Sequence, residues 1–300
     1  MKEEHEPKSK LIAVVLNIIA VGAGYLYVGK FNKLLLIFPL LILLSWFFYY
    51  ASTIYPIGYM VLLYYGIIVF VYLYVSYDVI KIISKKEDKN IKQNKNIFIF
   101  LYVAVYFASL VLILTFSPIL KYKVLSEAMK STIMANDNII VIRDTKNISR
   151  GDIIAFMYPK NPKVHFVKRC VAQGGDIVAL HNKNLFLHPK EGNEYIKNNY
   201  PQKNTIRIQD KLWVINPYKR KHKGIHNDKN VTKKDKYIKA LFDMEPILVP
   251  DNHFFVMGDN RDHSNDSRFW GTVPKEYLIG KVKSIYINFS DLSRTGIMIK

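Results

Sequence analysis

Residues 254–274 read FFVMGDNRDHSNDSRFWGTVP. The first four residues are apolar, as in a buried strand, and charged and hydroxyl side chains follow between Gly258 and Gly271. A strand that ends in such a cluster directs several polar groups to one place. The stretch therefore predicts a β-containing domain with a functional site at the end of this strand.

The chain from Lys121 onward consists of short apolar segments separated by Gly, Pro and Asn. The runs that predict strands are 138–142, 152–156, 164–167 and 176–180. Gly151 and the pair Gly174-Gly175 lie where strands are expected to start, and glycine gives the backbone the freedom that a turn requires. Periodic helical patterns are nearly absent, so we expect residues 121–300 to form a mostly β domain.

Three uncharged stretches dominate the first part of the chain. They are Leu11–Gly29, Leu34–Tyr77 and Ile97–Leu120. A spanning helix needs about 20 apolar residues, so the first and third stretches suffice for one span each and the second for two. Buried helices of a soluble core are the alternative, but uninterrupted runs of this length are rare there. Residues 1–120 are therefore predicted to be a membrane anchor of about four hydrophobic helices, with a break near 52–56.

The charges of the connecting segments predict the orientation of this anchor. The connection 78–96 carries six lysines, and short basic loops stay in the cytoplasm. One more crossing then places residues 121–300 outside. The first ten residues have balanced charges, which argues against a cleavable signal peptide and favours a retained segment 11–29. The N-terminus is outside if that segment spans the membrane, and cytoplasmic if the segment only dips into it.

The formal charge of +19 is unevenly distributed, and a lysine-rich insertion is predicted at about 190–245. Between Lys197 and Lys239 there are 13 Lys or Arg against 3 acidic residues. Nucleic acid is one possible partner for such a patch. A domain outside the cytoplasm meets anionic lipid headgroups first, so we expect a lipid surface and no nucleic acid. A solvated lysine-rich surface is the alternative.

Metal and disulfide chemistry have little support in the sequence. Cys170 is the only cysteine, so the chain can form no intramolecular disulfide and no cysteine-based metal site. The histidines show no ligand spacing such as His-Glu-x-x-His. We therefore expect neither a metal nor a cofactor.

Four motifs in the second part of the chain resemble those of the type I signal peptidases. These bacterial membrane proteases use a serine and a lysine to remove signal peptides from exported proteins. Residues 126–133, SEAMKSTI, resemble the nucleophile box, which usually reads SGSMxPTL. Residues 150–156, RGDIIAF, are similar to the second box and 168–176, KRCVAQGGD, to the lysine box. Residues 258–274 match the fourth box nearly residue for residue.

The resemblance implies that Lys168 is the general base. A serine hydroxyl becomes a good nucleophile only when a neighbouring base takes its proton. The lysine must then be neutral near pH 7, far below its ordinary pKa of about 10.4, and burial among apolar side chains can lower the pKa in this way. Phe166 is expected on the same strand face as Lys168. Ser264 would orient the lysine amine.

The resemblance also implies roles for other residues of the boxes. Ser126 would contribute its hydroxyl to an oxyanion hole, beside the backbone amide of residue 128. Supporting roles would fall to an ion pair of Asp266 with Arg268, and to Asp259 and Arg261, which would hold the loop. The substrate would lie extended between strands 122–126 and 164–168. Small pockets would select small residues at the first and third positions before the cut.

Ala128 stands where the family has its nucleophilic serine, and alanine has no oxygen to attack with. One explanation is a replaced serine, which gives an inactive enzyme that can still hold its substrate. The other is a noncatalytic signal-peptide-binding or export-accessory membrane protein. The presence of Lys168 and Ser264 favours the first, since these groups have little purpose without a nucleophile. Ser126 is expected about 6.6 Å away along one strand face, too far to substitute.

The sequence is therefore interpreted as a multi-span α-helical membrane anchor followed by a mostly β exported domain with a signal-peptidase-like fold. The expected location is the bacterial inner (plasma) membrane, with the catalytic domain on its outer side. Signal peptides of exported preproteins and the lipid bilayer are the expected partners.

Overall fold

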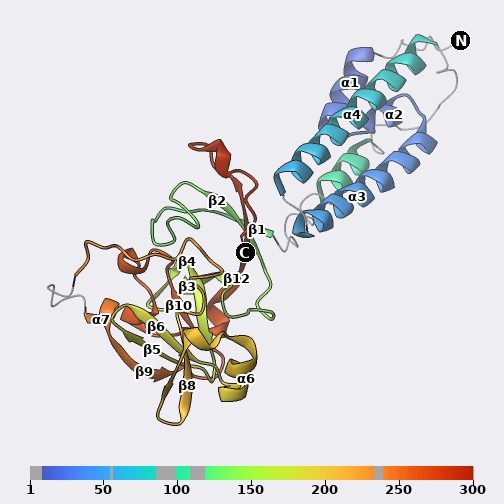
Figure 1. Ribbon diagram of the computed structural model, residues 1–300. Helices are drawn as coiled ribbons and strands as arrows, with labels where there is room; N and C mark the ends of the chain where they lie inside the picture. The colour runs from blue at the N-terminus through green and yellow to red at the C-terminus, as the bar shows by residue number, and fades with distance from the viewer. Residues whose placement is uncertain (1–8, 55–56, 86–98, 109–118, 233–238, 300) are drawn as a thin grey trace, which may run out of the picture. The chain divides into compact units, whose positions relative to one another are not determined.

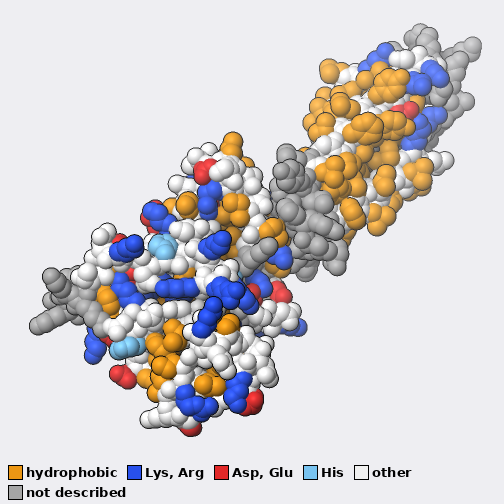
Figure 2. All heavy atoms as spheres, in the orientation of Figure 1, with side chains coloured by type: hydrophobic (Ala, Val, Ile, Leu, Met, Phe, Trp, Pro, Cys, Tyr) orange, Lys and Arg blue, Asp and Glu red, His pale blue; other side chains and the backbone are white. Residues whose placement is uncertain are grey.

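The computed structural model describes residues 9–54, 57–85, 99–108, 119–232 and 239–299 (Figure 1). The chain divides into two compact units, Met1–Ser117 and Pro118–Lys300. Hydrophobic side chains cover much of the visible surface of the first unit, whereas Lys and Arg are spread over that of the second (Figure 2).

The first unit is helical in all of its described segments. Its helices are α1 (Lys10–Ile19), α2 (Ala23–Tyr27), α3 (Phe31–Ile54), α4 (Ile57–Ser84) and a further helix, Ile99–Ala108. By length and composition α3 and α4 can each cross a membrane, in the windows Phe31–Phe48 and Leu63–Ser84. The second apolar stretch therefore forms two helices, as predicted. Of the basic connection 78–96, residues 78–84 belong to α4. Residues 86–98 and 109–118 lie outside the described residues.

The first apolar stretch is not the single helix that its composition suggested. It breaks at Gly22, whose φ of +98° is a conformation that glycine adopts without strain. The Asn17 Oδ1 atom accepts hydrogen bonds from the amides of Gly22 (3.2 Å) and Gly24 (2.9 Å), which the break would otherwise leave without partners. Neither α1 nor α2 approaches the roughly 20 residues of a span. The structure thus fits a dipping segment better than a spanning one.

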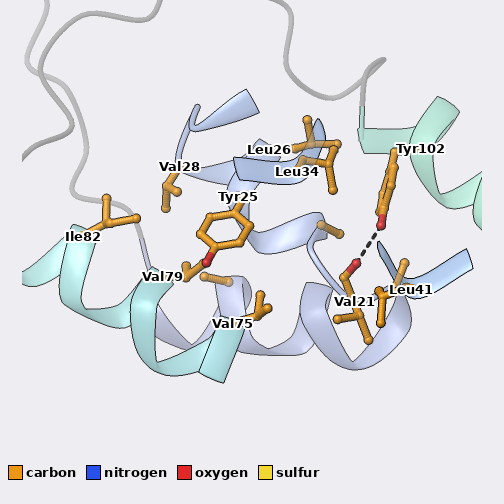
Figure 3. Close-up of a cluster of buried hydrophobic side chains, with 13 residues drawn as sticks. Val21, Tyr25, Leu26, Val28, Leu34, Leu41, Val75, Val79, Ile82 and Tyr102 are labelled. Carbon is orange, nitrogen blue, oxygen red and sulfur yellow. Dashed lines mark hydrogen bonds between the residues drawn. The ribbon is translucent and has the colours of Figure 1, made fainter. Parts of the chain in front are cut away.

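A cluster of buried apolar side chains joins these helices (Figure 3). The Tyr102 hydroxyl donates a hydrogen bond to the Val21 carbonyl (2.6 Å), which ties the helix Ile99–Ala108 to the break after α1. Asp78 of α4 accepts a hydrogen bond from the Tyr25 hydroxyl (2.7 Å) and pairs with Lys33 near the start of α3. The short helices are therefore fixed to the long ones by polar as well as apolar contacts.

The second unit is built from two antiparallel sheets, which confirms the prediction of a mostly β domain. The larger sheet has the order β1 (Ile119–Lys123), β2 (Asn138–Ile142), β12 (Leu278–Ile287), β3 (Ile153–Tyr158), β4 (Asn161–Gln173), β10 (His253–Met257) and β11 (Val273–Pro274). The smaller sheet has the order β7 (Thr205–Ile208), β8 (Lys211–Ile215), β6 (Asn184–His188), β5 (Ile177–His181) and β9 (Met244–Leu248). Three short helices, α6 (Gly192–Asn199), α7 (Lys239–Phe242) and α8 (Ser267–Trp270), lie between the strands.

Strand β4 changes partner along its length, and this change creates an open edge. Residues 161–169 pair with β3, whereas residues 169–173 pair with β10 on the opposite side. The β10-side edge of 161–168 therefore has no strand partner among the described residues. The rings of Tyr122 on β1 and His165 on β4 lie 5.5 Å apart, although three strands separate β1 from β4 in the sheet. The sheet must therefore curve until β1, its terminal strand, approaches the open edge of β4.

The lysine-rich insertion is integrated into this fold. Its strands β7 and β8 extend the smaller sheet, with β8 pairing with β6. The Tyr218 hydroxyl donates a hydrogen bond to the Val171 carbonyl in β4 (2.7 Å). The insertion therefore packs directly on the strand that carries Lys168.

Candidate active site

Residue 128 lies in a turn that the domain core holds in place. The turn follows β1 and covers residues 127–132. Two of its neighbours, Met129 and Ile133, are fully buried in the same apolar cluster as the inner residues of β2 and β3. Ala128 itself is buried. The turn is thus anchored by apolar side chains that follow the nucleophile position, and the buried Val124 of the same cluster precedes it.

Ser126 is placed differently from the prediction. β1 ends at Lys123, so Ser126 does not share a strand face with residue 128, and its side chain is exposed. The predicted strand 122–126 was therefore too long. The backbone pairing continues to Val124, whose amide and carbonyl bond to Asp137 and Asn136, and the chain leaves it at residues 125–126 to enter the nucleophile turn. Alternating apolar residues alone do not reveal this end.

A groove of about 440 Å³ brings the two central positions together. Residues 122–129 line one side of it and residues 164–168 the other, with His263 and Asn265 also in the lining. Ala128 and Lys168 both line this groove. Its two sides are β1, with the connection after it, and the open edge of β4, so an extended peptide could add to either strand.

Lys168 is buried on β4, with 4% of its surface exposed. Its Nζ lies 5.1 Å from the centre of the Phe166 ring, which confirms the prediction that Phe166 shares its face. Burial lowers the pKa of Lys168 from 10.5 to about 8, the Asp266 carboxylate opposes this change and the Arg268 guanidinium adds to it. A substantial fraction of the amine is therefore neutral just above neutral pH.

Gly258 allows Ser264 and residue 128 to approach each other. A Cβ atom on Gly258 would lie 2.3 Å from the Ser264 Oγ and 2.4 Å from the Ala128 carbonyl oxygen. Any side chain at position 258 would therefore push both groups away. Ser264 is also buried, and its Oγ has no hydrogen-bond partner among the described residues, Lys168 included.

Asp266 and Arg268 form a buried ion pair within the loop of residues 258–268. The Arg268 Nε donates to one Asp266 oxygen (2.8 Å) and a terminal nitrogen to the other (2.9 Å). Asp266 also accepts the Gly258 amide (2.9 Å), and Arg268 donates to the Arg261 carbonyl (2.5 Å). Burial alone would raise the pKa of Asp266, but Arg268 and the hydrogen bonds hold it below its usual value. The aspartate thus stays ionised and fixes the backbone at both ends of the loop.

Asp259 is held by a residue that the sequence did not single out. Arg169 donates two hydrogen bonds to its carboxylate (2.8 and 2.6 Å), and both side chains are fully buried. Thr132, in the nucleophile turn, donates a third (2.6 Å). Arg261 does not pair with Asp259, and its Nε has no hydrogen-bond partner in the described parts of the chain. The sequence feature that could have identified Arg169 as a partner is its position next to Lys168, because neighbouring residues of a strand point to opposite faces.

Asn260 connects the fourth box to the nucleophile turn. Its backbone amide donates to the Ala128 carbonyl and its side-chain amide to the Glu127 carbonyl, both at 3.1 Å. Asn260 was missed because its role depends on two backbone carbonyls more than 130 positions earlier in the chain. Together with Gly258 it sets where residue 128 lies relative to Lys168.

The described residues contain no group of three or more His, Cys, Asp or Glu side chains that could hold a metal ion. Cys170 is fully buried in β4, and burial raises the pKa of its thiol.

Comparisons with known proteins point to one family. The family described as "Signal peptidase, peptidase S26" matches residues 94–287. A signal peptidase I of Helicobacter pylori is 37% identical over 161 residues, which cover 47% of this chain and 56% of that protein. A signal peptidase I of Aquifex aeolicus is 33% identical over 192 residues, 55% of this chain and 74% of that protein. The match thus spans little more than half the length of the Helicobacter protein.

Among solved structures, a signal peptidase I from Enterococcus faecalis is similar over 45% of this chain and 97% of its own. It has 25% sequence identity and a TM-score of 0.30.

Proposed function

The chain belongs to the signal peptidase family, peptidase S26, and we propose that it is built as a signal peptidase I whose nucleophile position holds alanine. In this proposal it is a membrane serine endopeptidase scaffold that binds the signal peptides of exported preproteins. The observation that carries the proposal is the buried Lys168, with its lowered pKa, in the same groove as residue 128. Burying a lysine costs free energy, because the charged form loses its hydration. General-base chemistry is one function that requires a buried lysine with a lowered pKa.

A serine at position 128 would complete the reaction. Neutral Lys168 would take the proton from the serine oxygen as that oxygen bonds to the substrate carbonyl carbon. The protonated amine would then return the proton to the leaving nitrogen as the peptide bond breaks. Lys168, neutral again, would activate a water molecule to release the acyl group. Ser264, held beside Gly258, would orient the lysine amine throughout.

The developing oxyanion needs hydrogen-bond donors that do not have to move. We assign this role to the amide of residue 128 and the hydroxyl of Ser126. Ser126 is exposed at the rim of the groove, so a bound substrate would cover it. The turn itself is held by Asn260, whose two hydrogen bonds to residues 127 and 128 support this assignment.

The substrate would lie extended between β1 and the open edge of β4, with the residues before the cut along these strands. Met129, Ile133 and Ala155 line the groove close to residue 128. An apolar lining of this kind suits small side chains at the first and third positions before the cut.

With Ala128 the chain should hold precursors without cutting them. The alternative is a noncatalytic signal-peptide-binding or export-accessory protein, which would have no need of a base. In this proposal Lys168 would be the base and Ser264 and the Asp266–Arg268 pair would support it, and their joint presence favours the catalytic scaffold.

Binding to the chain as it stands tests the proposal. The full chain in a mild detergent should bind a precursor with alanine at the first and third positions before the cut. Bulky phenylalanine at these two positions should weaken binding by at least about tenfold, because an overfilled pocket costs roughly 1–3 kcal/mol. Equal affinity for both precursors would reject the groove as the recognition site.

We further propose that the chain lies in the bacterial inner membrane with the β domain on the outer side. The two candidate spans and the basic connection 78–96 support this orientation. A thiol introduced at Lys221 should react with an impermeant reagent outside intact cells, and one at Lys86 should not. The native Cys170 is buried and should give no background. The opposite labelling pattern would reverse the topology.

A further inference from the structure

The last described residues of the chain fold back onto the β domain. After β12, residues 288–299, here called the C-terminal return, form a short 3-10 helix (Leu292–Arg294) and then run back along β12. The Ile285 amide of β12 donates to the Ile297 carbonyl (2.8 Å), and the Ile285 carbonyl accepts the Gly296 amide (2.9 Å). Because β12 lies inside the larger sheet, these hydrogen bonds anchor the return to the core of the domain.

Arg294 of the C-terminal return forms an ion pair with Asp137, which is fully buried. The arginine Nε donates to one carboxylate oxygen (2.9 Å) and a terminal nitrogen to the other (2.7 Å). The Asn288 side-chain amide donates to the same carboxylate (2.7 Å). Burial alone would raise the pKa of Asp137, but these hydrogen bonds hold it below its usual value. Asp137 is therefore ionised at neutral pH and bound to the return.

Asp137 also closes the loop that carries residue 128. Its carboxylate accepts the Met134 amide (2.8 Å), and its backbone carbonyl accepts the Val124 amide (2.8 Å). Residues 124–137 thus form a loop whose ends meet at Asp137, and the nucleophile turn lies between these ends. The ion pair with Arg294 therefore joins the C-terminal return to the base of this loop.

A second contact of Arg294 reaches the nucleophile turn itself. The same terminal nitrogen donates to the Thr132 carbonyl (3.2 Å). The Thr132 amide in turn donates to the Met129 carbonyl (3.0 Å), next to residue 128. Gly224 confines the Thr132 side chain, because a Cβ atom on Gly224 would lie 2.0 Å from the Oγ1. Asn260 thus holds the first residues of the turn, and Arg294 holds the last.

We propose that Arg294 is a positioning residue, which fixes the nucleophile turn so that residue 128 stays within reach of Lys168. This inference rests on the proposed function, because a serine at position 128 must give its proton to that lysine. Neither Arg294 nor Asp137 lines the groove, so the pair acts on the position of the turn and not on the substrate. A misplacement of about 1 Å in a catalytic site costs about 100-fold in rate.

Arg294→Met, made in the full-length Ala128→Ser chain in mild detergent, tests this role. The kcat should fall about 100-fold, because the turn is no longer held at its far end. The KM should change by no more than about threefold, because the groove keeps its lining. The dissociation constant of the uncut precursor, measured with Ala128 in place, should change equally little.

Arg150→Met is the matched control, because it breaks a similar ion pair in the same domain. The Arg150 and Arg294 side chains are 13% and 12% exposed, and both partner aspartates are fully buried. Arg150 bonds to Asp176 and Glu191, which neither belong to the nucleophile turn nor line the groove. Both replacements should lower the Tm, but Arg150→Met should leave kcat within about threefold.

Lysine variants keep the test decisive if Arg294→Met does not fold. Arg294→Lys preserves the charge that Asp137 needs, but an ammonium group cannot bond to both carboxylate oxygens and the Thr132 carbonyl in the geometry of a guanidinium. It should lower kcat about tenfold, whereas Arg150→Lys should leave kcat within about threefold.

Ala128→Cys gives a readout that needs no catalysis. Ala128 is buried, so a thiol at this position should react with a small uncharged alkylating reagent mainly when the turn opens. The native Cys170 is fully buried and should give no background. Adding Arg294→Met should speed alkylation at position 128 at least about tenfold, whereas adding Arg150→Met should change the rate by less than about threefold.

The outcomes separate this inference from the proposed function. If kcat survives the change at Arg294, or falls as far with the change at Arg150, the positioning role is wrong and the proposed function stands. An alkylation rate that Arg294→Met leaves unchanged overturns the role in the same way. An Ala128→Ser chain that neither binds nor cleaves precursors refutes the proposed function, and the alkylation rates alone then decide whether Arg294 holds residue 128.

Discussion

Replacing Lys168 with methionine should make the folded chain more stable at neutral pH. Methionine fills nearly the same volume without a charge. Burial lowers the pKa of Lys168 from 10.5 to about 8, and each unit corresponds to about 1.4 kcal/mol of preference for the neutral form. The free energy of unfolding should therefore rise by about 3 kcal/mol. For a domain of this size that corresponds to an increase in Tm of about 5–10 °C.

The pH dependence of the stability gain distinguishes the effect of removing the buried charge from the effect of better apolar packing. At pH 7, about one unit below this pKa, the lysine is mostly protonated in both the folded and the unfolded chain, so the folded chain bears nearly the full cost of the buried charge. Between pH 8 and 10.5 the folded chain binds fewer protons than the unfolded chain, so its stability rises with pH. The advantage of methionine should therefore shrink across this window and nearly disappear above it.

Thermal unfolding of the full chain in mild detergent, followed by tryptophan fluorescence, measures this difference. Trp213 and Trp270 lie in the β domain. Lys163→Met, an exposed lysine on the same strand, is the matched control and should change the free energy of unfolding by no more than about 0.5 kcal/mol. The reasoning is refuted if Lys168→Met gives no gain at pH 7, or a gain that stays constant from pH 7 to about pH 11.

Further predictions concern the supporting groups. In the Ala128→Ser chain, kcat/KM should rise about tenfold per pH unit below pH 8 and then level off, because the base must lose its proton; a flat profile would exclude the lysine as base. Arg169→Met should lower the free energy of unfolding by about 3–5 kcal/mol, because it leaves the Asp259 carboxylate buried and unpaired; an unchanged melting temperature would contradict this. Gly258→Ala, made in Ala128→Ser, should cut turnover about 100-fold with less effect on precursor binding, since the new Cβ displaces the turn; unchanged turnover would show that the close approach is unimportant.

Much of the β domain could be predicted because its strands are short apolar segments and because glycine is required at several of its turns. Gly151 (φ +94°) and Gly175 (φ +87°) do precede β3 and β5, as expected. The extent of β4 was underestimated at its start, because its outer residues Asn161, Pro162 and Lys163 are exposed and show no apolar alternation, and proline is unusual in strands. Its change of partner depends on pairing with β10, which lies some 80 residues later and which no local pattern encodes.

The helical unit was harder to predict in its first segment. Residues 11–29 are apolar throughout, so hydropathy alone cannot show a break. The break depends on Asn17, which caps amides five and seven positions later, and on close packing of Gly24 against it. The single asparagine in this apolar run is therefore the sequence feature that could have predicted the break.

Within the candidate site, the motifs predicted that residue 128, Lys168 and Ser264 lie in one region and that Asp266 pairs with Arg268, as it does in the structure, but they did not reveal the partner of Asp259. Proximity in the sequence does not always identify an ion-pair partner. Asp259 had Arg261 two positions away, yet its partner is Arg169, because alternation along β4 turns Arg169 to the face opposite Lys168. The positions of Asn260 and Gly224 depend on contacts with the nucleophile turn that only the folded chain reveals.

The central claim is that the chain lacks only a hydroxyl at position 128 to be a signal peptidase. The direct measurement follows one purified precursor by mass spectrometry with the chain as it stands, with Ala128→Ser, and with Ala128→Ser combined with Lys168→Ala. Only Ala128→Ser should cleave, after a small-x-small sequence, at a rate about 10⁶-fold above the unchanged chain, the cost of losing a covalent nucleophile. If Ala128→Ser binds the precursor but leaves it intact, or if the unchanged chain already cleaves it, the claim is wrong.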